Sequence, residues 1–195
     1  MSKNQPPNLD EIRDFVIAGH GNLEKIKQML AVRPALLKLS YEWEPGNTET
    51  ALQAAAQVGN QDVARYLLAQ GAPLDICTAA MLGLKEDVEH FLMEDPASIH
   101  ATGAHGIPLL THAALSGDVE LMQLIFQRGA RDGMSPALIN AVNKGHVGMT
   151  RWILENGEPD VGLKNFQGKT PLEIAVERGD SEIAEMLRSY GTTHY

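Results

Sequence analysis

Three histidines are the residues of this sequence with the clearest potential for chemistry. The chain has seven histidines, and His100, His105 and His112 lie close together along it. Imidazole can bind transition metals or transfer protons, but metal sites usually combine it with cysteine or carboxylate ligands at regular spacings. No His-Glu-x-x-His motif and no cysteine pair accompanies these histidines. We therefore expect no metal site, and keep a metal-binding, small-molecule-binding or enzyme-accessory role for the three as the alternative.

The arrangements that activate a nucleophile or bind a phosphate group are also missing. No serine lies in a Gly-x-Ser-x-Gly turn, and no glycine-rich loop has phosphate-binding spacing. The single cysteine, Cys77, cannot form an intrachain disulfide, which is typical of a protein in a reducing compartment. The sequence thus favours a binding protein without cofactors over an enzyme.

Composition and charge narrow the class of partner. The chain is 44% hydrophobic, enough to bury a core, and its formal net charge is −9. This charge argues against a duplex nucleic-acid binder, which needs a basic surface, and would attract a basic protein partner. The first residues contain no apolar signal-peptide core, and no apolar run approaches the length of a membrane span. We therefore expect a soluble cytoplasmic monomer with no membrane partner.

Pairs of short amphipathic helices recur along the chain and would position these residues. In the clearest pair, Leu172 and Ala175 lie on one apolar face before Gly179, and Ile183 and Leu187 lie on another after it. Neither helix is long enough to be stable alone, so each pair needs a neighbour to stack on. Similar pairs surround five earlier glycines, which are Gly21, Gly59, Gly83, Gly117 and Gly145. The sequence therefore predicts six stacked helix pairs.

This repeat resembles the ankyrin repeat. The ankyrin pattern is Thr-Pro-Leu-His-x-Ala-Ala-x-x-Gly-His, followed by a second helix that ends in Leu-Leu-x-x-Gly-Ala. The resemblance covers roughly Leu9 to Gly191, although the His of the pattern is never present and only Thr170-Pro171-Leu172 keeps its first three residues. It implies an all-α, ankyrin-type helical solenoid of six degenerate repeats with short β-hairpin fingers. One domain would cover 9–191, between a flexible tail at 1–8 and a C-terminal tail at 192–195.

The spacing of the central glycines indicates three double repeats. Successive glycines are unevenly spaced, but every second one is 62, 58, 62 and 62 residues apart. Longer loops follow the odd repeats, whose second helices end near Pro34, Pro96 and Pro159. Because the long loops of an ankyrin stack form its hairpin fingers, we expect fingers at about 39–50, 99–108 and 160–169. Fingers would be reduced or missing at 73–76 and 131–135.

The resemblance also implies where a partner binds. In ankyrin repeats, the two residues before the central glycine and several finger residues face a concave groove. The corresponding helix positions here include His20, Gln57, Val58, Met81, Leu82, Leu115, Ser116, Asn143, Lys144, Glu177 and Arg178. The corresponding finger positions include Asn47, Glu49, His105, Ile107, Phe166, Gln167 and Lys169, and we add Trp43 of the first finger. These residues predict a non-enzymatic protein-interaction module that acts as a scaffold, adaptor or inhibitor.

Four neighbouring groove positions are apolar, and two interpretations of them stay open. Val58, Met81, Leu82 and Leu115 fall in consecutive repeats, and no finger at 73–76 would shade Met81 and Leu82. An exposed apolar patch there would bind a partner. Irregular packing would instead make these side chains part of the core. Trp43 is similarly either a binding anchor or a residue that packs the first hairpin, together with Tyr41, against its repeat.

Overall fold

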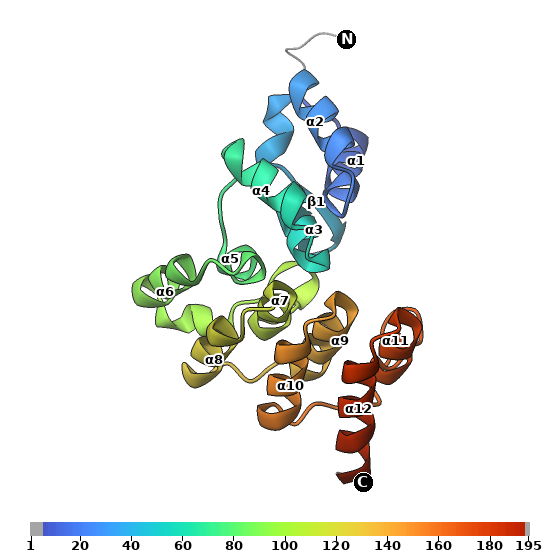
Figure 1. Cartoon of the computed structure of the whole chain (residues 1–195). Helices are drawn as coiled ribbons and strands as arrows, with labels where there is room; N and C mark the ends of the chain where they lie inside the picture. The colour runs from blue at the N-terminus through green and yellow to red at the C-terminus, as the bar shows by residue number, and fades with distance from the viewer. Residues whose placement is uncertain (1–5, 194–195) are drawn as a thin grey trace.

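Six consecutive pairs of α-helices make up the part of the chain that the computed structural model describes, residues 6–193 (Figure 1). The first helices of the pairs are α1 (Leu9–Gly19), α3 (Ala51–Val58), α5 (Ile76–Leu82), α7 (Leu109–Ser116), α9 (Met134–Lys144) and α11 (Pro171–Arg178). The second helices are α2 (Leu23–Val32), α4 (Gln61–Ala69), α6 (Lys85–Glu94), α8 (Val119–Gln127), α10 (Val147–Asn156) and α12 (Ser181–Thr193). We number the pairs repeats 1 to 6. They confirm the predicted all-α helical solenoid.

Local sequence sets where these helices begin and end. Three helices begin with a capping box, at Asn8, Thr50 and Thr170. In a capping box, the side chain of the cap residue accepts the backbone N–H of the third helical residue, and the side chain of that residue accepts the backbone N–H of the cap. The first helices of repeats 2 to 6 all end at a glycine in the left-handed conformation. At Gly117, φ is 76° and an added Cβ would lie 2.9 Å from the ring of His146. Five of the six central glycines of the sequence pattern are therefore helix ends, whereas Gly21 follows the cap residue His20 of α1.

We expect Thr170→Ala to lower the free energy of unfolding by about 1 kcal/mol. The Thr170 hydroxyl accepts a hydrogen bond from the backbone N–H of Glu173, which would otherwise be unpaired at the start of α11. Urea denaturation followed by circular dichroism measures the loss. Thr48→Ala, at an exposed position of the hairpin, is the matched control and should change the same quantity by less than about 0.5 kcal/mol. Equal effects of the two substitutions would contradict the capping role.

The ends of the helical stack lie close to the predicted boundaries. The first helix, α1, begins at Leu9 as expected, whereas α12 continues to Thr193. The helix α12 therefore includes the first two residues of the predicted C-terminal tail at 192–195, and the remaining two lie outside the described part of the chain. Residues 1–5 and 194–195 lie outside the described part of the chain, so the flexible tail at 1–8 and the single-domain division remain predictions.

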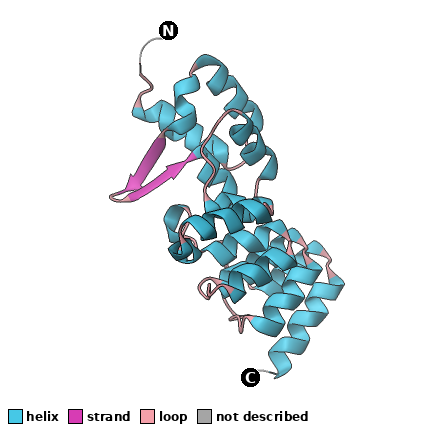
Figure 2. Ribbon diagram, turned by 90° about the vertical axis from the view of Figure 1, so that its left-hand side faces the viewer, coloured by secondary structure: helices cyan, strands magenta, loops and turns pink. Residues whose placement is uncertain are grey.

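One of the three predicted fingers is a β-hairpin. Strands β1 (Ser40–Glu44) and β2 (Asn47–Thr50) pair antiparallel and pack against α1 (Figure 2). The loop at 99–108 instead contains short 3₁₀ turns and a single bridge between Thr102 and Pro108. The loop at 160–169 contains turns without strands, because the Asn165 side chain accepts backbone N–H groups that a hairpin ladder would use. The segments 73–76 and 131–135 form no strand, as predicted.

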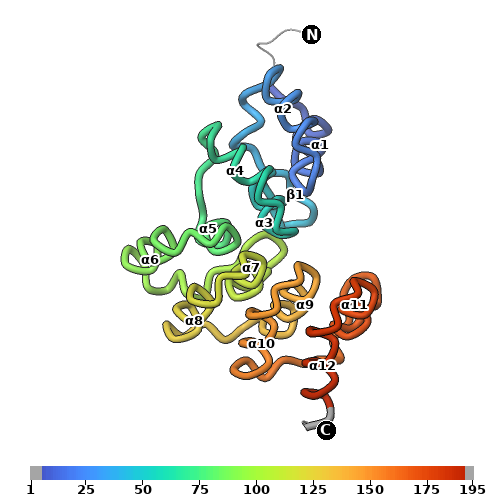
Figure 3. The backbone as a smooth tube through the Cα atoms, viewed as in Figure 1, coloured from blue at the N-terminus to red at the C-terminus, as the bar shows by residue number. Residues whose placement is uncertain are grey.

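The hydrophobic core divides at the joint between repeats 2 and 3. Repeats 3 to 6 share one cluster of buried side chains, and repeats 1 and 2 share a second. Where the finger at 73–76 is missing, the chain crosses from α4 to α5 as an extended segment (Figure 3). Met81, Leu82 and Leu115 lie on α5 and α7 but belong to the cluster of repeats 1 and 2. These three side chains therefore join the two parts of the solenoid.

Candidate interaction surface

The predicted apolar patch of the groove is mostly core, which corrects one of the two open interpretations. Met81, Leu82 and Leu115 are buried, and Met81 is completely inaccessible. Repeats 1 and 2 pack onto these side chains at the joint that lacks a finger, so Met81 and Leu82 offer no surface to a partner and Leu115 only contributes to the wall of a cleft. Val58 is the exception, because its side chain stays exposed at the end of α3.

Two cationic side chains at groove positions donate hydrogen bonds to carbonyls at the helix ends of other repeats. Lys144 Nζ donates to the carbonyl of Gly59 at 3.1 Å, and Arg178 Nη1 donates to the carbonyl of Asn143 at 2.7 Å. His146 Nε2 lies 3.2 Å from the carbonyl of Leu115 in the same way. Positive groups are stabilised at helix C-termini, where carbonyls lack helical partners. Lys144 and Arg178 are exposed, but some of their donors already have internal partners, and their contact with a partner stays a prediction.

The Ser116 side chain also has internal hydrogen-bond partners while it remains partly accessible. Its hydroxyl donates to the carbonyl of Ala113 at 2.7 Å and accepts the backbone N–H of Asp118 at 3.0 Å. The side chain is half-buried, so it shapes the groove wall between α7 and α8. A contact between Ser116 and a partner remains a prediction.

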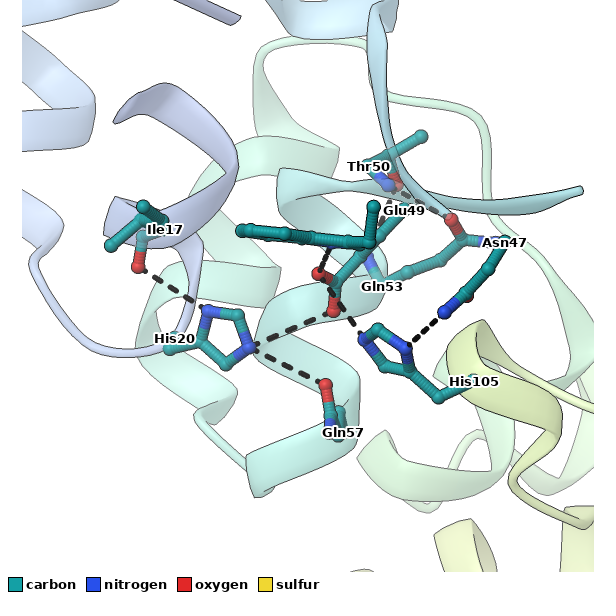
Figure 4. A network of polar contacts seen from close by, with 9 residues as sticks. Ile17, His20, Asn47, Glu49, Thr50, Gln53, Gln57 and His105 are labelled. Atoms are coloured by element: carbon teal, nitrogen blue, oxygen red, sulfur yellow. Dashed lines mark hydrogen bonds and ion pairs between the residues drawn. The ribbon is translucent and has the colours of Figure 1, made fainter. Parts of the chain in front are cut away.

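A buried carboxylate lies where three distant segments meet (Figure 4). Glu49 of β2 is completely buried, with an exposed fraction of 0%. His20, at the end of α1, places Nε2 3.6 Å from Glu49 Oε1, and His105 of the 99–108 loop places Nε2 3.5 Å from Oε2. His105 also shares a 2.9 Å hydrogen bond with the Asn47 side chain. Because the finger at 73–76 is missing, the first hairpin and the 99–108 loop contact each other directly.

Trp43 is part of this buried cluster. Its indole Nε1 donates to Glu49 Oε2 at 2.8 Å, and its ring lies edge-to-face with Tyr41 at a centroid distance of 4.9 Å. Both aromatic side chains are half-buried against the hairpin. These contacts favour the packing interpretation of Trp43 over that of a free binding anchor.

The three histidines of the alternative interpretation do not come together. His112 is buried in α7 with neither ring nitrogen hydrogen-bonded, His105 contacts Glu49, and His100 is exposed to solvent. Burial lowers the pKa of His112, because the low-dielectric core disfavours the charged imidazole. Burial likewise raises the pKa of the Cys77 thiol to about 12, so it is not an activated nucleophile. Among residues 6–193, no group of three or more His, Cys, Asp or Glu side chains could hold a metal ion.

The loop at 160–169 carries the most exposed large apolar side chain in the described part of the chain. Phe166 is 94% exposed at its tip, beside the exposed Gln167. The loop is tied to α11 by an ion pair between Lys169 and Glu177. Ile107, predicted as a contact in the 99–108 loop, is only half-exposed. The 160–169 loop and the end of α11 therefore form the predicted surface that is most open to a partner.

The repeat pattern places His20, Gln57 and Glu49 at contact positions, and the structure brings their side chains together. Glu49 is one of several glutamates in its hairpin, and its burial depends on α1 and the 99–108 loop, which are distant in sequence. In β2, Glu49 lies between two more exposed residues, so its side chain points inward.

Sequence comparisons agree with the architecture. The family model described as "Ankyrin repeats (3 copies)" matches residues 110–194, and the single ankyrin repeat model matches residues 47–79. These two segments together make up more than half of the chain. In the described residues, no helix has the length and apolar character needed to cross a membrane.

A viral protein is similar over part of its length. The fowlpox virus (strain NVSL) protein FPV014, whose name describes it as an ankyrin repeat protein, is 27% identical over 124 residues. The match covers 60% of this chain and 28% of the viral protein, so the chain spans only about a quarter of that relative. Repeat pattern, helical architecture and family matches lead to one assignment: this chain belongs to the ankyrin repeat family.

Proposed function

We propose that this protein binds a protein partner without catalysis, as a scaffold, adaptor or inhibitor, through its concave groove and finger tips. The 160–169 loop carries this proposal, because Phe166 is 94% exposed on a turn held by hydrogen bonds to Asn165 and by the Lys169–Glu177 ion pair. A single exposed apolar residue is common on protein surfaces. An aromatic side chain on an ordered turn, however, loses little conformational freedom on binding.

Further groove residues would surround this anchor. Asn143, Lys144, Glu177 and Arg178 are exposed at the ends of α9 and α11 and offer both donors and acceptors. The net charge of −9 would speed association with a basic partner. A monomer in the cytoplasm, where the buried Cys77 thiol stays reduced, suits this role.

The test is capture of a partner by the immobilised protein from an extract of the source cells, followed by calorimetric titration of the captured protein. We expect Phe166→Asp to weaken binding by at least about tenfold, because it replaces an apolar anchor with a charge. Met93→Asp is the matched control, since Met93 is 70% exposed on α6 of repeat 3, outside the proposed surface. Unchanged affinity of Phe166→Asp, or an equal loss with Met93→Asp, would contradict the proposal.

A further inference from the structure

Only one of the two oxygens of the Glu49 carboxylate accepts a hydrogen bond. Its Oε2 atom accepts the indole N–H of Trp43 at 2.8 Å and lies 3.5 Å from His105 Nε2. Its Oε1 atom is buried and makes no hydrogen bond, and the nearest donor, His20 Nε2, is 3.6 Å away. A buried carboxylate oxygen without a donor is unfavourable, because the charge has lost its hydration. The structure therefore lacks a donor at one defined atom.

Three acceptor oxygens surround His20, which is more than the number of N–H groups that a neutral imidazole can donate. His20 Nε2 lies 3.4 Å from Gln57 Oε1 as well as near Glu49, and Nδ1 lies 3.3 Å from the carbonyl of Ile17 (Figure 4). A neutral imidazole has a single N–H, and all three distances are long for hydrogen bonds. The three acceptors come from α1, β2 and α3, so a ligand with several donors in one plane would satisfy them better than His20 does.

The His20 side chain lies between the buried Glu49 carboxylate and an open cleft. The His20 side chain is 35% exposed and lines an open cleft of about 500 Å³, together with Val58, Leu115, Lys144 and His146. Lys144 and His146 direct their donors at the carbonyls of Gly59 and Leu115 and so do not serve Glu49. A partly exposed side chain with weak contacts exchanges rotamers rapidly. Rotation of His20 into the cleft would uncover Glu49 Oε1.

We propose that this cleft binds the guanidinium group of an arginine side chain on the protein partner, with Glu49 as the anion that it pairs with. The planar guanidinium offers five N–H donors and can bond Glu49 Oε1, Gln57 Oε1 and the Ile17 carbonyl together, whereas an ammonium group is a compact point charge. The exposed Val58 side chain gives the apolar stem of the arginine a surface to pack on. The inference rests on the proposed function, because it names the partner group that enters the groove.

The test needs no partner protein, since N-acetyl-arginine amide serves as the probe. In a Trp152→Phe background, Trp43 is the only tryptophan, and its bond to Glu49 makes its fluorescence report on this carboxylate. We expect a saturable fluorescence change with a dissociation constant of about a millimolar. Glu49→Gln should weaken binding by about tenfold or more, while Glu44→Gln, an exposed glutamate of the same hairpin, should not alter it. N-acetyl-citrulline amide, the uncharged counterpart of the probe, should give no saturable change.

A second variant keeps the inference testable if Glu49→Gln lowers the melting temperature. His20→Ala retains Glu49 and removes the competing imidazole, so it should bind the arginine probe several-fold more tightly than the parent. Equal or weaker binding by His20→Ala, equal binding by Glu49→Gln, or an equal response to the citrulline probe would each overturn the inference. If the arginine titration fails, the result of the partner capture with Phe166→Asp remains valid. If the partner capture fails, the result of the arginine titration is unaffected.

Discussion

Met81→Ala should lower the free energy of unfolding by about 3 kcal/mol, although its position in the repeat pattern predicts a groove residue. Met81 is completely buried in the cluster of repeats 1 and 2, and its truncation leaves a cavity that the rigid helices cannot fill. Urea denaturation at neutral pH measures the loss. Met93→Ala is the matched control, because Met93 is 70% exposed on the adjoining α6, and it should change stability by less than about 0.5 kcal/mol.

The same substitution should separate the unfolding of the two parts of the solenoid. Stability in repeat proteins depends on contacts between neighbouring repeats, and Met81 is one of the side chains that join repeats 1 and 2 to the others. Trp43 reports on the first part and Trp152 on the second. We expect the Trp43 transition of Met81→Ala to move to lower urea than that of Trp152. Coincident transitions with no loss beyond that of Met93→Ala would show that this joint is not packed.

Acidification should destabilise the fold through His112. Burial lowers the pKa of His112 below 6.5, and the smaller effects of the Asp75 charge and the Ala56 backbone oppose this shift. The folded state therefore keeps the imidazole neutral, whereas the unfolded chain takes up a proton as the pH falls below 6.5. The stability is complete above pH 6.5 and is lost as the pH falls toward the pKa of the folded state. The free energy of unfolding should therefore be lower at pH 5.5 than at pH 7.5.

Urea denaturation at both pH values tests the role of His112. His112→Leu should remove most of this pH dependence, and it should not destabilise the protein at neutral pH by more than about 1 kcal/mol, because leucine places an apolar side chain of similar size at this buried position. His100→Leu, at an exposed position, should keep the full pH dependence. The measurement stays above pH 4.5, because capping hydrogen bonds lower the pKa of Glu11 and Glu173 in the folded state. Below pH 4.5 the protonation of these two carboxylates would also destabilise the fold and would obscure the effect of His112. An unchanged pH dependence in His112→Leu would contradict the prediction.

The helix pairs and their order could be predicted from the sequence because the signals are local. Each helix follows from an apolar period of its own residues, and each first helix of repeats 2 to 6 ends at a glycine such as Gly117 that adopts a positive φ. Capping residues such as Thr50 and Thr170 act within one turn of their own helix. The exposed Phe166 follows from the length of its loop, which carries it beyond the helices.

Only the tertiary structure decided which groove positions stay open. Met81, Leu82 and Leu115 occupy repeat positions that face the groove, and the packing of repeats 1 and 2 across the joint buries them. Glu49 likewise occupies a finger position of the repeat pattern, and it becomes a buried anion because α1 and the 99–108 loop bring His20 and His105 against it. Burial sums the contacts of segments far apart in the chain, whereas a repeat pattern describes each residue relative to its near neighbours. The sequence therefore determined the helices of this protein, and the packing between distant repeats determined which side chains a partner can reach.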